Sequence, residues 1–166
     1  MAVAGAISRF QRTNELACYT AGLFLHPRAL AVTATAFASL PISAAMQANL
    51  AAIDAVRPGV PWNRPHEVAV QVLTAGMVTL GLLQGRVPTL IKSEAYRRYY
   101  MHKTGHWLGM DVHDVGEYKL GDVWRDLESG MVLTIEPGLY VAPGAREAPP
   151  ELRGLGIRIE DDVLVT

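Results

Sequence analysis

Residues Met101–Gly116 read MHKTGHWLGMDVHDVG and hold three of the five histidines of the chain, His102, His106 and His113. Imidazole titrates near neutral pH and ligates metals readily. Because these histidines lie close together, are separated by glycines and are followed by acidic residues, the stretch indicates a functional site. Clustering alone leaves an alternative open, in which the histidines cap turns or form local hydrogen bonds.

Two predicted strands downstream carry glutamates. The run GMVLTIEPG at Gly130–Gly138 is typical of a strand closed by a Pro-Gly turn, with Glu136 at its end. The run Gly156–Val165 is a second strand, in which Glu160 and Arg158 face the same side. Burying an unpaired carboxylate is costly, so each glutamate needs a hydrogen bond, an ion pair or a cation. Taken singly, an exposed strand end suffices for Glu136 and an ion pair with Arg158 for Glu160.

Together, His106, Glu136 and Glu160 form a mixed nitrogen and oxygen ligand set. Such a set suits Mn, Zn, Fe or Co. A carboxylate in it can also bridge two metals about 3.5–4 Å apart. We therefore predict a metal site built from these three side chains.

The composition is that of one globular domain. The chain has 166 residues, of which 50% are hydrophobic and 19% charged, with a net charge of -1. It contains no basic run and no apolar stretch of about 18 residues, so no nucleic-acid partner, membrane partner or transmembrane helix is expected. The single Cys18 excludes an internal disulfide framework and favours a reducing compartment, so we expect a cytoplasmic location.

Three helices are predicted upstream of the histidine stretch. They run from near Ile42 to a stop at Arg57-Pro58-Gly59, from Asn63–Pro65 to Gly81, and over Thr89–Arg98. In the first helix, the large apolar residues predict one buried stripe, formed by Ile42, Met46, Leu50 and Ile53. Glu117–Ser129 is expected to be a surface loop. Helices that precede strands indicate an α+β fold.

Three motifs in this order resemble aminopeptidase P, the Xaa-Pro aminopeptidase of the pita-bread metallopeptidase family. They are His102-x-x-x-His106-Trp-Leu-Gly-x-Asp-Val-His113, then Gly130-Met-Val-Leu-Thr-Ile-Glu136-Pro-Gly, then Arg153-Gly-x-Gly-Ile-Arg158-Ile-Glu160. The resemblance covers roughly residues 44–166, and the His-Trp-Leu-Gly form favours aminopeptidase P over prolidase. It implies a partial pita-bread fold, an antiparallel sheet with helices packed on one face, with residues 42–166 forming the C-terminal half of the catalytic domain.

The resemblance also implies roles for individual residues. The metal ligands would be His106, Glu136 and Glu160, with Glu160 bridging two manganese ions as in the family. The residues that contact substrate, move protons or orient the ligands would be His102, His113 and Arg158. The substrates would be peptides with proline at the second position.

The chain departs from the family pattern upstream. The family's other two metal ligands are aspartates on an earlier hairpin, whereas Asp54 is the one aspartate before His102 and lies on a predicted helix. We therefore expect at most one metal and impaired peptidase activity. Residues 1–41, which we assign neither helix nor strand, form a divergent segment, and a truncated or frame-shifted gene is one explanation.

Two other functions stay open. One is a non-catalytic fragment or binding module of the same fold, since the fold does not determine the function. The other is a single-metal His/Glu/Glu hydrolase of another type. Half of a pita-bread domain would also expose the apolar face that its missing half covers, so the chain could form a homo-oligomer.

Overall fold

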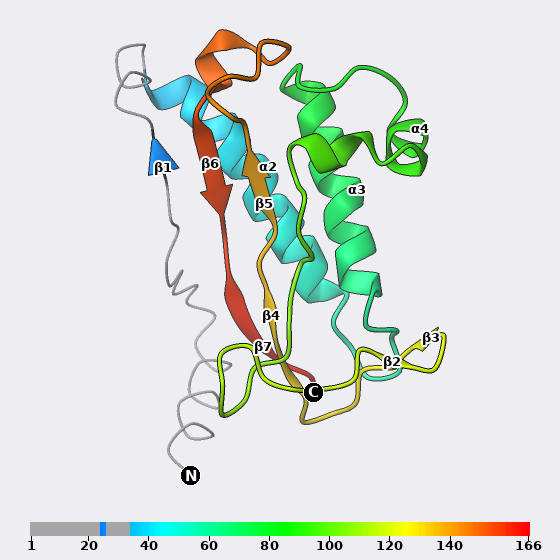
Figure 1. Cartoon of the computed structure of the whole chain (residues 1–166). Coiled ribbons are helices and arrows are strands. Elements are labelled where there is room, and N and C mark those ends of the chain that lie inside the picture. Colours follow the sequence, from blue (N-terminus) through cyan, green and yellow to red (C-terminus); the bar gives the residue numbers. More distant parts are fainter. Residues whose placement is uncertain (1–23, 26–33) are drawn as a thin grey trace.

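The computed structural model of the chain describes residues 24–25 and 34–166 (Figure 1). Two long helices, α2 (Ala34–Asp54) and α3 (Arg64–Thr79), pack side by side and cover one face of a layer of antiparallel strands. The α+β architecture, with helices on one face of the sheet, is as predicted. Most of the segment 1–41 lies outside the described residues.

Helix α2 begins earlier than predicted, at Ala34 rather than near Ile42, and Pro41 lies inside it. A proline in a helix interior removes one backbone hydrogen bond and clashes with the preceding turn, so it usually marks a boundary. The sequence pattern therefore placed the start of the helix just after this residue. The predicted end near Arg57 agrees with a last helical residue at Asp54.

The predicted apolar stripe of α2 is wrong in part. Met46 and Leu50 are 41% and 43% exposed, whereas the fully buried positions of the helix hold small or polar side chains. Among the described side chains of α2, these positions are Ala45, Ala48, Asn49 and Ala52, and Pro41 is also buried. Small residues let the helices approach closely: a Cβ added at Gly76 of α3 would lie 2.8 Å from the Ala44 Cβ. Close approach therefore selects alanine over the larger residues that define a stripe.

Helix α3 starts where the sequence predicted, with Pro65 in its first turn and Glu67 near its N-terminus. The predicted third helix is divided into α4 (Val87–Lys92) and a 3₁₀ turn, η2 (Ala95–Arg98). Glu94 separates them with a left-handed backbone, φ 54°. That conformation interrupts the right-handed helix.

Four short strands form one long antiparallel ribbon. β5 (Gly138–Tyr140) pairs with β6 (Leu155–Arg158), and β4 (Val132–Ile135) pairs with β7 (Asp161–Leu164). The predicted Pro-Gly turn after Glu136 is therefore wrong, because the chain runs on from β4 into β5 (Figure 1). Pro137 has no backbone N–H to donate, which interrupts the ladder without reversing the chain.

Four smaller elements are also present in the described part of the chain. β1 (Phe24–Leu25) pairs with β6, and the 3₁₀ turn η3 (Pro150–Leu152) precedes β6. The predicted surface loop Glu117–Ser129 contains a small hairpin, β2 (Lys119–Leu120) and β3 (Val123–Trp124). Among the described residues, no helix is long and apolar enough to cross a membrane.

The buried side chains form two clusters between helices and strands. The larger one joins Leu73 and Met77 of α3 to Leu139 and Ile157 of β5 and β6. The smaller one includes Leu133 and Ile135 of β4 and the Trp107 ring of the histidine stretch. The second cluster anchors the stretch Met101–Gly116 against the sheet.

Candidate metal centre

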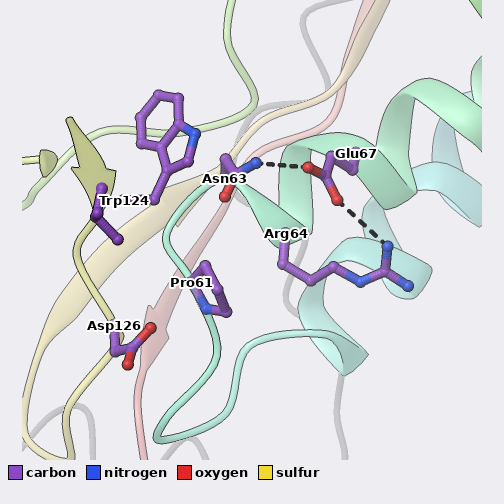
Figure 2. A pocket seen from close by; sticks show the side chains of 7 residues that line it. Pro61, Asn63, Arg64, Glu67, Trp124 and Asp126 are labelled. Carbon is purple, nitrogen blue, oxygen red and sulfur yellow. Dashed lines mark hydrogen bonds and ion pairs between the residues drawn. The ribbon is translucent and has the colours of Figure 1, made fainter.

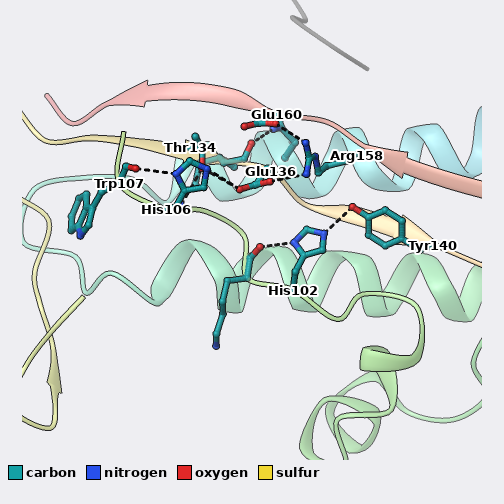
Figure 3. Close-up of polar contacts among 11 residues, drawn as sticks. His102, His106, Trp107, Thr134, Glu136, Tyr140, Arg158 and Glu160 are labelled. Atoms are coloured by element: carbon teal, nitrogen blue, oxygen red, sulfur yellow. Dashed lines mark hydrogen bonds and ion pairs between the residues drawn. The ribbon is translucent and has the colours of Figure 1, made fainter. Parts of the chain in front are cut away.

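Three segments far apart in the sequence bring His106, Glu136 and Glu160 together (Figure 3). One ligand atom from each of the three side chains lies within 4.8 Å of the others. His106 comes from the segment beside β4, Glu136 follows β4, and Glu160 precedes β7. The structure thus places the three predicted ligands around a common point.

The imidazole of His106 is oriented by backbone contacts. The segment that carries it pairs with β4, because the Thr134 N–H donates to the His106 carbonyl at 2.9 Å. Its ring Nδ1 lies 2.9 Å from the Trp107 carbonyl oxygen, so Nδ1 carries a proton and donates it. Nε2 then faces Glu136 Oε1 at 3.4 Å. A neutral Nε2 and a carboxylate oxygen are both acceptors, so a proton or a metal cation between them satisfies both.

Glu136 and Glu160 are cross-strand neighbours. The register is the same on both sides of the strand break, since Ile135 pairs with Asp161 and Gly138 with Arg158. That register sets Glu136 opposite Glu160. Like charges directly opposite each other on a sheet are destabilising unless a cation neutralises them.

Arg158 neutralises part of this charge. Its Nη1 lies 3.4 Å from Glu136 Oε2 and its Nη2 lies 3.3 Å from Glu160 Oε2. One guanidinium against two carboxylates leaves one negative charge in excess. The Glu136 side chain is 12% exposed, so that excess charge is poorly hydrated. The donor set and its charge fit a divalent cation.

A close backbone contact holds the His106 segment against the sheet. The Glu136 N–H donates to the Thr104 carbonyl at 2.6 Å, and the Thr134 hydroxyl lies 3.3 Å from Glu136 Oε1. Gly105 faces the Thr134 carbonyl so closely that a Cβ there would overlap it. Glycine is therefore required at position 105, because there is no room for a side chain between this segment and β4.

The other two histidines that were predicted to act in the site, His113 and His102, have different neighbours. The ring of His113, which is exposed, has its centroid 4.2 Å from that of His106. His102 instead contacts Tyr140 of β5, with Nε2 2.8 Å from the hydroxyl oxygen (Figure 3). Its Nδ1 lies 2.7 Å from the Lys103 carbonyl oxygen and donates to it, so in the neutral ring Nε2 accepts from the Tyr140 hydroxyl. Burial raises the pKa of Tyr140, which keeps that hydroxyl protonated.

The model of metallopeptidase family M24 matches residues 30–166. The chain belongs to metallopeptidase family M24. It is 46% identical over 121 residues to the Xaa-Pro aminopeptidase of Haemophilus influenzae, an alignment that covers 73% of this chain and 28% of that protein. The chain therefore spans about a quarter to a third of the length of such relatives.

Solved structures agree with this membership in M24. The aminopeptidase PepP of Pseudomonas aeruginosa superposes with a TM-score of 0.78 and 53% identity, over 80% of this chain and 30% of that one. Zinc-substituted aminopeptidase P of Escherichia coli in complex with product gives 0.75 and 43%, with the same coverage. The predicted resemblance to aminopeptidase P and the partial pita-bread fold are confirmed.

The candidate metal centre has a buried polar support that the sequence does not predict. Thr104 Oγ1 lies 2.8 Å from His66 Nδ1 and 2.6 Å from the Tyr100 hydroxyl. Burial above all, with the nearby Lys103, lowers the pKa of His66 to about 4, so its ring is neutral at pH 7. His66 stands far from the other histidines in the sequence, and no local signal connects it with them.

The cavity shown in Figure 2 is separate from the candidate metal centre. Its volume is about 340 Å³, between the N-terminus of α3 and the β2–β3 hairpin. Its lining residues are Pro61, Asn63, Arg64, Glu67, Val123, Trp124 and Asp126. Arg64 and Glu67 form an exposed ion pair with each other, 3.4 Å apart. The cavity shares no residue with the His/Glu set.

Proposed function

We propose that this chain carries the C-terminal part of a metal-dependent Xaa-Pro aminopeptidase site. The observation that carries the proposal is the convergence of His106, Glu136 and Glu160 on one point, in a chain related to Xaa-Pro aminopeptidases. The substrates would be peptides with proline at the second position, and manganese is the metal we expect. A cytoplasmic location accords with the single Cys18.

A divalent cation in such a site polarises the peptide carbonyl and makes water a better nucleophile. The residues of this chain then hold and orient the reactants. Arg158 keeps the two glutamates in place. Both ring nitrogens of His102 have partners, Nδ1 the Lys103 carbonyl and Nε2 the Tyr140 hydroxyl, so a proton would pass between His102 and substrate through that hydroxyl. His113 lies against His106 and is exposed, so it is accessible to a bound peptide.

A set of three protein ligands is better suited to holding one metal ion than to holding a pair of metal ions. Asp54, the one aspartate upstream of His102, is 81% exposed on α2 and pairs with Arg57, so it lies outside the cluster. We therefore propose that these three ligands hold a single metal, and that hydrolysis with these ligands alone is far slower than with the full ligand set of the family. A non-catalytic role, with association through exposed residues of α2 such as Met46 and Leu50, is the second candidate.

A paired binding and activity assay tests the proposal. The purified chain is dialysed against manganese, its metal content is measured, and it is then assayed with an Xaa-Pro peptide. We expect about one metal per chain, slow hydrolysis, and loss of both in His106→Ala. Glu67→Gln, in the separate cavity, is the matched control and should change neither. Metal binding without any hydrolysis would favour the non-catalytic role, and no binding at all would overturn the metal site.

A further inference from the structure

Among the side chains of α2 that the structure describes, Asn49 is the buried polar one, 1% exposed at the face that packs on the strands. The other buried polar side chains described are threonines. The Thr74 hydroxyl donates to the Val70 carbonyl of its own helix. The Thr104 hydroxyl contacts the Tyr100 hydroxyl, and the Thr134 hydroxyl accepts from the His106 N–H. Burying an amide is unfavourable unless its donors are used. Asn49 therefore needs partners on the sheet.

The amide of Asn49 donates to two strand carbonyls. Its Nδ2 lies 3.1 Å from the Ile135 oxygen and 3.5 Å from the Ile159 oxygen. The same side chain also hydrogen-bonds to the Asp161 carboxyl, next to Glu160, so its two amide protons are shared among three acceptors. The reverse orientation would set the amide oxygen against two carbonyls. Ile135 directly precedes Glu136, and Ile159 directly precedes Glu160. One side chain thus contacts the backbone beside both proposed ligands.

Pro137 explains why a side chain is needed here. Across the strand break the Ile159 N–H donates to the Pro137 carbonyl at 3.3 Å. In a regular antiparallel pair the opposite N–H would donate back to Ile159, but proline has none. The Ile159 carbonyl is thereby deprived of its ladder donor, and Asn49 takes that place from the helix.

We propose that Asn49 is a positioning residue for the two glutamates: its amide replaces the missing ladder bond and so keeps Glu136 opposite Glu160. Without it, the backbone at the break is free to twist, and the two carboxylates no longer converge. The consequence for metal binding rests on the proposed function. The effect on the strand break does not, because it exists without any metal.

Hydrogen exchange of the metal-free protein is the first test. Asn49→Leu keeps the side-chain size and removes both donors, and Thr74→Val removes a buried hydrogen bond internal to α3. After normalisation to global stability, we expect protection of the Ile159 and Glu136 amide protons to fall about tenfold in Asn49→Leu and to stay unchanged in Thr74→Val. Equal protection in both variants would overturn the proposal.

A rescue experiment separates positioning from general destabilisation. Pro137→Ala supplies a backbone N–H opposite Ile159, so Asn49→Leu/Pro137→Ala should recover most of the lost protection. A purely structural contribution of Asn49 to core packing would not be restored by a change in the strand. Lack of recovery would therefore count against the proposal.

Metal binding is the second readout, measured by calorimetry with manganese on folded protein. We expect a dissociation constant about 10–100-fold larger in Asn49→Leu than in wild type or Thr74→Val. If wild type binds no metal while the exchange result holds, the proposed function fails and the positioning role stands.

Should Asn49→Leu not fold, Asn49→Ala, which matches the neighbouring alanines, takes its place. Failure of both variants to fold would make Asn49 a general fold determinant and overturn the proposal.

Discussion

Glu136 and Glu160 stand opposite each other at the break in the antiparallel ribbon, and Arg158 pairs with both. The two carboxylates repel each other, and the guanidinium, whose side chain is 52% exposed, offsets that repulsion only in part. In the metal-free protein, the remaining repulsion between Glu136 and Glu160 therefore destabilises the fold at this site. A cation that binds there stabilises the fold as well as the site.

Glu160→Gln tests this repulsion. In the metal-free protein the change removes the repulsion with Glu136 and one ion pair of Arg158, two effects of opposite sign. We expect the free energy of unfolding to change by less than about 1 kcal/mol. Added manganese should raise the melting temperature of wild type, because it binds the native state, and leave Glu160→Gln nearly unchanged. A metal-dependent shift of the same size in both proteins would contradict the prediction.

Gly105→Ala should be strongly destabilising. Its Cβ would overlap the Thr134 carbonyl, and the backbone that carries His106 would have to leave the strand. We expect a loss of roughly 2–4 kcal/mol in chemical denaturation, with weaker metal binding. Gly144→Ala is the matched control, because a Cβ there meets nothing within 4 Å. Equal stability of the two variants would show that the segment does not lie this close to β4.

The neutral, buried state of His66 predicts a loss of stability in acid. Burial, with positive charges from Lys103 and Arg97, lowers its pKa from 6.5 to about 4 in the folded protein. The unfolded chain therefore binds the proton first. The free energy of unfolding should fall as the pH drops from about 6.5 to about 4, by roughly 3 kcal/mol from this group.

His66→Gln isolates this contribution. Its amide can still contact the Thr104 hydroxyl, but it does not titrate in this range. Urea unfolding at several pH values should give a shallower decline between pH 6.5 and 4 than in wild type. Parallel curves for the two proteins would assign the acid sensitivity to other groups.

The sequence predicted the convergence of His106, Glu136 and Glu160 better than it predicted the packing of α2. His106, Glu136 and Glu160 each lie in a recognisable sequence motif, so they can be identified although they are far apart in the sequence. The buried face of α2 carries no such mark, because its close packing selects alanines while Met46 and Leu50 point outward. Periodicity of large apolar residues is therefore misleading for this helix.

The strand break shows a second limit of sequence reasoning. Pro-Gly is typical of a turn, but β4 continues into β5 because the backbone on both sides keeps one register with β6 and β7. Asn49 was missed for a related reason. Its partners are backbone carbonyls of residues distant in sequence. Every residue has such a carbonyl, so the pattern of side chains does not indicate which of them accepts from Asn49.

The central claim is tested most directly by a crystal structure of the chain grown with manganese, with anomalous data collected at the manganese edge. The account predicts one anomalous peak per chain, about 2.0–2.3 Å from a ring nitrogen of His106 and from oxygens of Glu136 and Glu160. A peak bound elsewhere, or His106 and the two glutamates turned away from one another without any peak, would contradict it.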